Sequence, residues 1–168
     1  FSVPLAAGKF NMGIEGQMIV GATGATAVGI LCADLPGPVL VPLTMVSGVI
    51  FGAFYGLVPG WLLHRFGISE ILTTMMFNSI SFSIIDFVAT EVWRDPMAGH
   101  PTTIPIGEGA WLPMLVANPP LHSGIILAVF IAVGVYVYTN RSSGGYELVA
   151  TGAHPRAFAR PPLPHIND

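Results

Sequence analysis

The sequence predicts an all-α, polytopic transmembrane helix bundle, and three observations point to this fold class. Charged residues make up 9% of the 168 residues and hydrophobic residues 52%, whereas typical soluble proteins carry about 25% charged residues. The mean hydropathy is +0.70. Long uncharged stretches separate the charges, at 16–33, 35–64 and 109–140. Because about 20 apolar residues cross a bilayer as a helix, each stretch is long enough to hold one.

Four membrane segments follow in order. We expect them at about 14–32, 40–63, 69–90 and 122–139. A turn with two prolines around a glycine, 33–38, joins the first two segments, and a short link at 64–67 joins the next two. The third segment carries Asn78 and Asp86, so its polar side should face other helices or a water-filled path.

The segment 91–121 should lie outside the hydrocarbon core, because its six prolines exclude one continuous helix. With four crossings, five basic residues fall on one side of the membrane and only Arg94 on the other. The five are Lys9, Arg65, Arg141, Arg156 and Arg160. The positive-inside rule therefore places the link at Arg65 and the segment 140–157 in the cytoplasm and the loop 91–121 outside.

Several functional classes are disfavoured by composition. A net charge of −3 without clustered Lys or Arg argues against a nucleic-acid partner. The single cysteine, Cys32, excludes an internal disulfide and a zinc cluster. The one lysine, Lys9, has no phosphate-loop context, and the five histidines are scattered. We therefore expect no catalytic residue, no metal site and no cofactor.

Glycines recur at intervals of four in the second segment, at Gly48, Gly52, Gly56 and Gly60. This spacing places them on one helix face, where the missing side chains let another backbone approach closely. We predict that this face packs against another helix.

Polar residues crowd the start of the first segment and one side of the third. Asn11, Glu15 and Gln17 lie against an apolar helix, which indicates either a broken helix restarting near Gly13 inside the membrane or an interfacial helix start capped by Asn11. In the third segment, polar residues recur every three or four positions, which indicates either a solute path or interhelical hydrogen bonds. They include Glu70, Thr73, Thr74, Asn78 and Ser81.

The C-terminal stretch combines a short helix with helix-ending residues. We expect a helix at about 146–151, ended by Gly152 and kept from resuming by Pro155. It is either a juxtamembrane tail or a docking element for a cytoplasmic partner.

Four segments in this order resemble motifs of ABC importer permeases for simple sugars and nucleosides, in the branched-chain amino acid/ribose permease superfamily. They read FNMGIEGQM at 10–18, GISEILTTMMFN at 67–78, RDP at 94–96 and GYELVATGAHPRA at 145–157. The departures are Ser69, Val149 and His154, where the family usually has Asn, Arg and Asn. The resemblance stops after Ala157, so we expect a partial transmembrane permease domain at 1–157 followed by an atypical tail at 158–168.

The resemblance implies a multi-pass permease subunit of the bacterial inner membrane that moves a nucleoside or simple sugar by alternating access. Its implied partners are an ABC ATPase subunit that hydrolyses the ATP, a second permease subunit and an extracytoplasmic solute-binding lipoprotein. We predict a solute path along Asn11, Glu15, Gln17, Glu70, Thr74 and Asn78. We predict that the ATPase docks on Tyr146, Glu147, Leu148, Gly152 and Pro155. The alternative is a non-transporting membrane scaffold protein or an inactive permease fragment with the same glycine packing.

Overall fold

A computed structural model describes residues 2–6, 8, 11–116 and 121–153 of the chain. It divides into two compact units, Asn11–Ser123 and Phe1–Phe10 with Gly124–Asp168. The described residues include four helices that are long and apolar enough to cross a membrane. The predicted fold class, an all-α transmembrane helix bundle, is confirmed.

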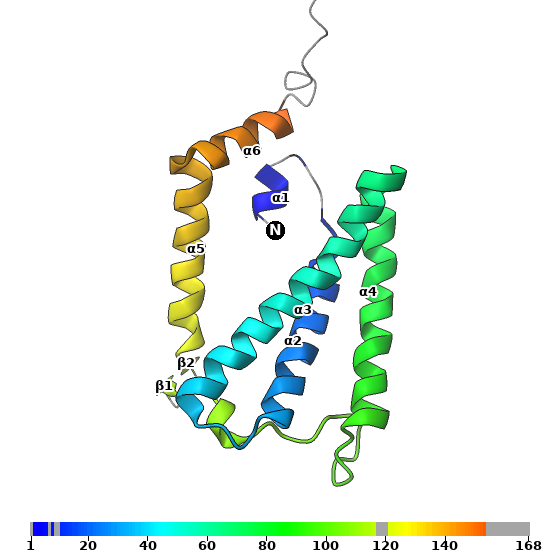
Figure 1. Cartoon of the computed structure of the whole chain (residues 1–168), viewed down its shortest axis with the longest axis vertical. Helices are drawn as coiled ribbons and strands as arrows, with labels where there is room; N and C mark the ends of the chain where they lie inside the picture. The colour runs from blue at the N-terminus through cyan, green and yellow to red at the C-terminus, as the bar shows by residue number, and fades with distance from the viewer. Residues whose placement is uncertain (1, 7, 9–10, 117–120, 154–168) are drawn as a thin grey trace, which may run out of the picture. The chain divides into compact units, whose positions relative to one another are not determined.

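The larger unit is built on three long helices, α2 (Ile14–Leu31), α3 (Gly37–Phe66) and α4 (Glu70–Phe87). Helix α2 contacts both of the others. Within this unit, the α2–α3 link lies at one end and the α3–α4 link at the opposite end (Figure 1). The three helices therefore run in alternating directions, as consecutive membrane crossings do.

Helix α3 is longer at both ends than the predicted 40–63. It begins at Gly37 because Pro38, in the first turn, occupies a position whose N–H has no partner within the helix. It ends where Gly67 adopts φ 66° and donates its N–H to the carbonyl of Leu63 at 2.9 Å. Thirty residues make about 45 Å of helix, more than a bilayer core of about 30 Å. The helix must tilt, and it crosses α2 obliquely in Figure 1.

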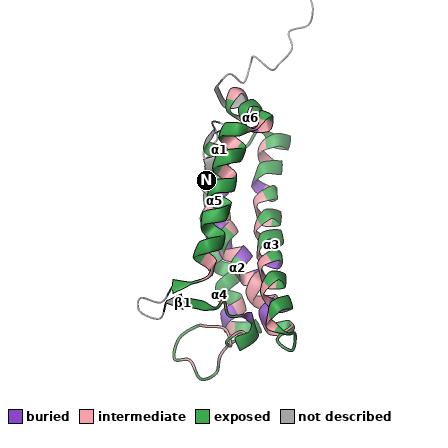
Figure 2. Cartoon of the chain, turned by 90° about the vertical axis from the view of Figure 1, so that its left-hand side faces the viewer, coloured by how far each residue is buried: buried purple, intermediate pink, exposed green. Residues whose placement is uncertain are grey.

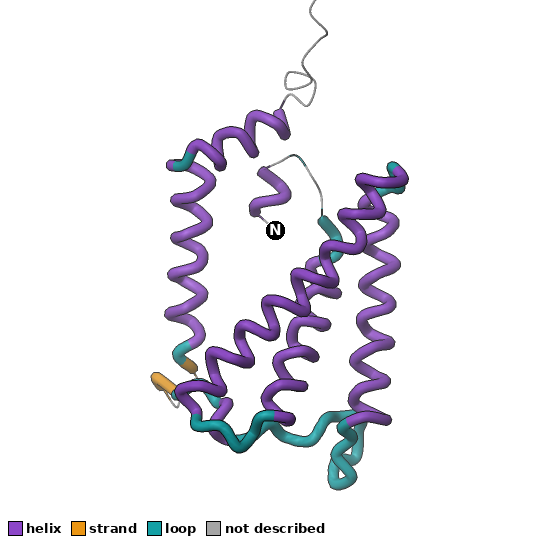
Figure 3. The backbone as a smooth tube through the Cα atoms, viewed as in Figure 1, coloured by secondary structure: helices purple, strands orange, loops and turns teal. Residues whose placement is uncertain are grey.

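Beyond α4 the chain continues as a π-helical turn, η1 (Val88–Val92), and then as short elements. These are the 3₁₀ turn η2 (Glu108–Ala110) and the strands β1 (Met114–Val116) and β2 (Leu121–His122), which pair antiparallel. Figure 3 shows that the described chain outside this segment is nearly all helix. The observed short elements agree with the proline content of this segment.

The end of the α2–α3 link packs against η2. A β-carbon on Gly37 would lie 2.9 Å from the carbonyl oxygen of Gly109. Ala110, the next residue after Gly109, is buried, and Leu40 in the first turn of α3 is fully buried. The segment after η1 therefore returns to close the same end of the unit as the α2–α3 link (Figure 1).

The core of the larger unit contains few large side chains. Its buried side chains are mostly small, whereas many Leu, Ile, Val and Phe side chains are exposed. The buried polar ones are Ser47, Thr73, Thr74 and Ser81. A bundle in lipid has this distribution, because apolar side chains gain nothing by leaving the hydrocarbon and close packing of small residues joins the helices.

The smaller unit contains α1 (Ser2–Ala6), α5 (Gly124–Arg141) and α6 (Ser143–Ala153). Helix α1 contacts both α5 and α6. Helix α5 begins and ends two residues later than the predicted 122–139, and none of its residues is buried (Figure 2). The tail predicted at 158–168 lies outside the described residues.

Candidate functional site

Helix α2 restarts next to the polar residues that the sequence singles out. Its first residue is Ile14 and its N-cap is Gly13, in agreement with the expected restart near Gly13. One of the two alternatives, an interfacial helix start, required the Asn11 side chain to cap the helix, and it does not. Its Oδ1 accepts a hydrogen bond from the N–H of Gly13 at 2.8 Å, so it closes the turn before the helix instead.

The cap of α2 comes from another helix. The Asn78 side chain, on α4, accepts a hydrogen bond from the N–H of Gly16 at 2.9 Å through Oδ1. Its Nδ2 donates to the carbonyl of Met12, also at 2.9 Å. Gly16 is the third residue of α2, and its N–H is one that an N-cap side chain ordinarily satisfies. Asn78 thus performs the capping from 62 residues away.

Small and hydroxyl side chains of α4 surround this contact. Thr74 is 2% exposed, and its Cβ would lie 3.1 Å from a β-carbon on Gly13. Its hydroxyl donates to the carbonyl of Glu70 at 2.8 Å. Ser81, fully buried beside Gly16, donates to the carbonyl of Asn78 at 2.6 Å. For Thr74 and Asn78 this geometry favours interhelical packing and hydrogen bonding over a wetted lining.

The start of α2 lies inside the bundle rather than level with the end of α4. Asn78 is eight residues beyond Glu70, the first residue of α4, which corresponds to about 12 Å along the helix axis. The contact between Asn78 and Gly16 therefore lies about two turns below the α3–α4 link. This depth favours a helix that restarts within the bundle over one that starts at its edge.

The predicted glycine face of α3 lies mainly against α2. A β-carbon on Gly48 would lie 3.3 Å from the carbonyl oxygen of Gly21, and one on Gly52 would lie 3.0 Å from that of Gln17. One on Gly56 would lie 2.8 Å from Nε2 of Gln17. The face does not extend to Gly60, which is exposed and has no described atom within 4 Å of its β-carbon position. Gln17, which faces Gly56, is the fourth residue of α2, so little of α2 remains opposite Gly60 one turn further along α3.

The matching glycines on α2 were not identified from the sequence. The buried residues of α2 are Gly16, Gly21, Gly24 and Gly29. Their spacings of five, three and five residues lie on several sides of the helix rather than in one stripe. Each side has a neighbour, because Gly16 faces α4, Gly24 faces the ring of Phe51 on α3, and Gly29 faces Ile106. Glycines spaced irregularly along one apolar segment therefore indicate a helix that packs against neighbours on more than one side.

The remaining predicted path residues keep surface that is not used in packing. Glu15 is exposed in the first turn of α2, and Glu70 is half-buried in the first turn of α4. Gln17 is half-buried between α2 and α3, beside Gly56. The structure brings Asn11, Thr74 and Asn78 together around Gly13 and Gly16 but does not bring Gln17 into that group. Among the described residues, no three His, Cys, Asp or Glu side chains form a group that could hold a metal ion.

Helix α6 carries the predicted docking residues. Tyr146 is 75% exposed, Glu147 is exposed and Leu148 is half-buried, whereas Pro155 lies outside the described residues. The predicted helix at about 146–151 is present, but α6 is longer at both ends, from Ser143 to Ala153, so the predicted end at Gly152 is wrong. Ser142 starts it earlier by accepting the N–H of Gly145 at 3.0 Å, as an N-cap does.

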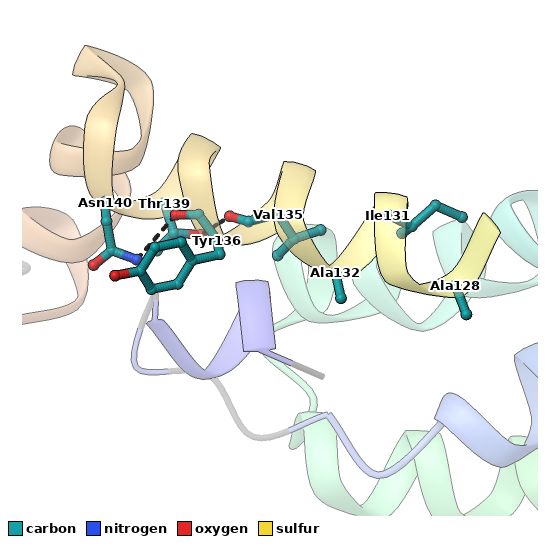
Figure 4. A pocket seen from close by; sticks show the side chains of 7 residues that line it. All are labelled: Ala128, Ile131, Ala132, Val135, Tyr136, Thr139 and Asn140. Carbon is teal, nitrogen blue, oxygen red and sulfur yellow. Dashed lines mark hydrogen bonds between the residues drawn. The ribbon is translucent and has the colours of Figure 1, made fainter. Parts of the chain in front are cut away.

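A hollow of about 600 Å³ lies along one face of α5 (Figure 4). Its polar side chains at one end are Tyr136, Thr139 and Asn140. The Thr139 hydroxyl donates to the carbonyl of Val135 at 2.8 Å, and the Asn140 amide donates to that of Tyr136 at 2.9 Å. Binding pockets usually present converging polar groups from several elements. These residues all lie on one helix and bond its own backbone, so the hollow is a helix face rather than a solute site.

A comparison with protein families identifies one that spans most of the chain. The profile described as "Branched-chain amino acid transport system / permease component" matches residues 2–159. The match includes all four candidate membrane spans and α6.

Three curated relatives carry similar descriptions. The chain is 30% identical over 165 residues to the nucleoside ABC transporter permease protein NupB of Lactococcus lactis, covering 94% of the chain and 45% of that protein. It is 34% identical over 155 residues to the guanosine ABC transporter permease protein NupP of Bacillus subtilis, covering 89% and 43%. It is 29% identical over 165 residues to a glucose ABC transporter permease protein of Haloferax volcanii, covering 92% and 43%. The chain thus spans less than half the length of these relatives. No solved structure matches it significantly.

Proposed function

This chain belongs to the family of permease components of branched-chain amino acid transport systems, and we propose that it forms part of the membrane-spanning subunit of an ABC importer. The subunit moves a nucleoside or simple sugar across the inner membrane of a bacterium by alternating access. The solute class follows that of the relatives, which are named as permeases for a nucleoside, guanosine and glucose. A separate ATPase subunit hydrolyses the ATP.

The observation that carries this proposal is the continuous family match over residues 2–159, together with four apolar helices in the matched region. A scaffold protein would share the glycine packing, but it docks no ATPase and so would not need the helix after α5. The match extends through α6, so it supports a permease over the scaffold alternative.

The residues divide between two tasks in this proposal. Helix α6 docks the ATPase through Tyr146, Glu147 and Leu148 on the side of the membrane where Arg65 and Arg141 lie. The segment 91–121 faces the solute-binding lipoprotein, and a second permease subunit completes the path. Among the path residues, Thr74 and Asn78 join α4 to the start of α2, and the others touch the solute. They are Asn11, Glu15, Gln17 and Glu70.

An uptake measurement tests the transport proposal. The full-length permease is reconstituted in proteoliposomes with its ATPase and binding lipoprotein, and uptake of labelled guanosine and labelled glucose is followed. We expect uptake of one of them that requires both ATP and the binding lipoprotein. ATP-independent uptake, or uptake that does not need the ATPase, would exclude an ABC importer.

The docking assignment predicts that Glu147→Arg weakens the association with the ATPase by about tenfold, because it reverses a charge at the centre of an interface. Glu147 is exposed on α6, next to Tyr146. The measurement is the amount of ATPase that co-purifies with the permease over a range of ATPase concentrations. Glu91→Arg, an equal charge reversal at an exposed residue of η1, is the matched control and should change nothing. Equal association of both variants with the ATPase would place the docking surface elsewhere.

A further inference from the structure

The Asn78 side chain uses both ends of its carboxamide on the backbone of another segment. Oδ1 accepts the N–H of Gly16 and Nδ2 donates to the carbonyl of Met12, each at 2.9 Å. Each bond uses one of the two lone pairs of Oδ1 or one of the two hydrogens of Nδ2, so the backbone at the start of α2 fixes the orientation of the carboxamide. The pair of bonds therefore ties both ends of the carboxamide to α2 and leaves only one acceptor and one donor position that a solute could use.

We propose that Asn78 is a positioning residue of the transport cycle: it fixes where α2 begins within the bundle and does not contact the solute. The role in a transport cycle rests on the proposed function, whereas the placement of α2 by Asn78 rests on the geometry alone. It replaces the prediction that Asn78 lines the solute path.

The position requires an asparagine because one planar group must donate and accept at once. An aspartate would keep the acceptor for Gly16 and lose the donor for Met12, and a leucine would lose both. The contact also requires a glycine at position 16, because a β-carbon there would lie 2.8 Å from Oδ1 of Asn78. Without Asn78, the N–H of Gly16 has no partner within its own helix. In an apolar bundle such a group is costly, so the first turn of α2 would fray or shift.

A neighbouring contact reports the position of that turn directly. A β-carbon on Gly13 would lie 3.1 Å from Cβ of Thr74. Disulfides need β-carbons about 3.5–4.5 Å apart, so a shift of a few tenths of an ångström allows a Gly13→Cys/Thr74→Cys pair to cross-link. Gly13 has φ −83°, which a non-glycine residue can adopt. The pair is placed in a full-length permease without other cysteines, with Cys32→Ser included.

The first measurement is the rate of disulfide formation in membranes under a mild oxidant, followed as the loss of maleimide labelling. Because two interhelical hydrogen bonds are removed, we expect Asn78→Ala to slow the cross-link by about fivefold or more. Ser79→Ala, a substitution of an exposed side chain one residue along α4, is the control and should leave the rate unchanged. Equal rates with and without Asn78 would overturn the inference, whatever the uptake shows.

The second measurement separates positioning from solute contact. In proteoliposomes with labelled guanosine or glucose, we expect Asn78→Ala to lower the maximal uptake rate and leave KM unchanged. Oxidation of the Gly13→Cys/Thr74→Cys pair in the Asn78→Ala permease should restore uptake, because the disulfide fastens the same turn. A raised KM that the disulfide does not correct would mean that Asn78 contacts the solute. Slower cross-linking together with no ATP-driven uptake by the unsubstituted permease would support the positioning of α2 and overturn the proposed function instead.

Discussion

Helices α2 and α5 have the same length and similar apolar character but pack in opposite ways. Each has 18 residues, with a mean hydropathy of 1.3 for α2 and 1.6 for α5. Four glycines of α2 are buried, and no residue of α5 is. Hydropathy therefore determines whether a helix can enter the membrane, and other features of the sequence determine how closely it packs there.

The difference lies in small residues and in the partners of polar side chains. Gly21 of α2 lies so close to α3 that its β-carbon would be 2.8 Å from the carbonyl oxygen of Gly48, whereas Gly134 of α5 has no described atom within 4 Å. Asn78 bonds the backbone of another segment, whereas Asn140 bonds the carbonyl of Tyr136 one turn earlier in its own helix. The same residue types thus join helices in one region and leave a helix self-contained in the other.

The largest expected effect comes from filling the α2–α3 contact. Gly21→Leu should lower the free energy of unfolding by about 3 kcal/mol, because backbone atoms on α3 cannot move aside without separating the helices. Gly134→Leu should not lower it and should raise it by up to about 1 kcal/mol, because the site is open and leucine has the better helix propensity. The free energy of unfolding is measured by denaturant titration of the full-length permease in detergent. Equal losses would remove the distinction between α2 and α5.

The corner between α5 and α6 tests whether the smaller unit has any close contact of its own. Gly145 is buried, and a β-carbon there would lie less than 3 Å from the carbonyl oxygens of Tyr138 and Thr139. Gly145→Ala should therefore destabilise the start of α6 by about 2 kcal/mol.

Gly144→Ala is the matched control and should act in the opposite direction. Its β-carbon would lie 3.0 Å from the hydroxyl of Tyr138, the end of a side chain that can rotate away. It then gains up to about 1 kcal/mol from the better helix propensity of alanine. Hydrogen exchange of peptides covering Ser143–Ala153 should be faster in Gly145→Ala and slower in Gly144→Ala. The same change in both variants would show that the corner is not tightly packed.

The sequence predicts those features that depend on one segment at a time. The gaps between charges locate three of the four apolar helices, and the i, i+4 spacing of Gly48, Gly52 and Gly56 marks the face that lies against α2. Both bounds of α6 were misplaced. The start is earlier because the Ser142 hydroxyl accepts the N–H of Gly145, and the end is later because the helix continues past Gly152 to Ala153. A glycine ends a helix only where the chain turns there, which spacing alone does not show.

The features that depend on two segments could not be predicted. From the sequence, Asn78 fits a solute path and an interhelical hydrogen bond equally well, because its role depends on where the unpaired backbone groups of α2 lie. The glycines of α2 form no stripe, because this helix has neighbours on several sides. Both features follow from the arrangement of α2 against α3 and α4, and that arrangement is not local in the sequence.

The smallest expected effect concerns the contact between α3 and α4. The Tyr55 hydroxyl donates to the carbonyl of Phe77 at 2.5 Å, and their rings lie 5.3 Å apart. Tyr55→Phe keeps the ring contact and removes the hydrogen bond, so the free energy of unfolding should fall by about 1 kcal/mol. Tyr136→Phe on α5, at a side chain that is 66% exposed, should leave it unchanged.

Combining Tyr55→Phe with Asn78→Ala shows whether α4 is held as a unit. Phe77 and Asn78 are consecutive, and they bond α3 and α2 respectively. If each bond holds the same turn of α4, loss of one loosens the other, and the two losses in free energy of unfolding should differ from additivity by at least about 0.5 kcal/mol. Strict additivity would mean that α2 and α3 hold α4 independently. In that case the close packing of the larger unit is a set of separate helix pairs, and the contrast with α5 is one of degree.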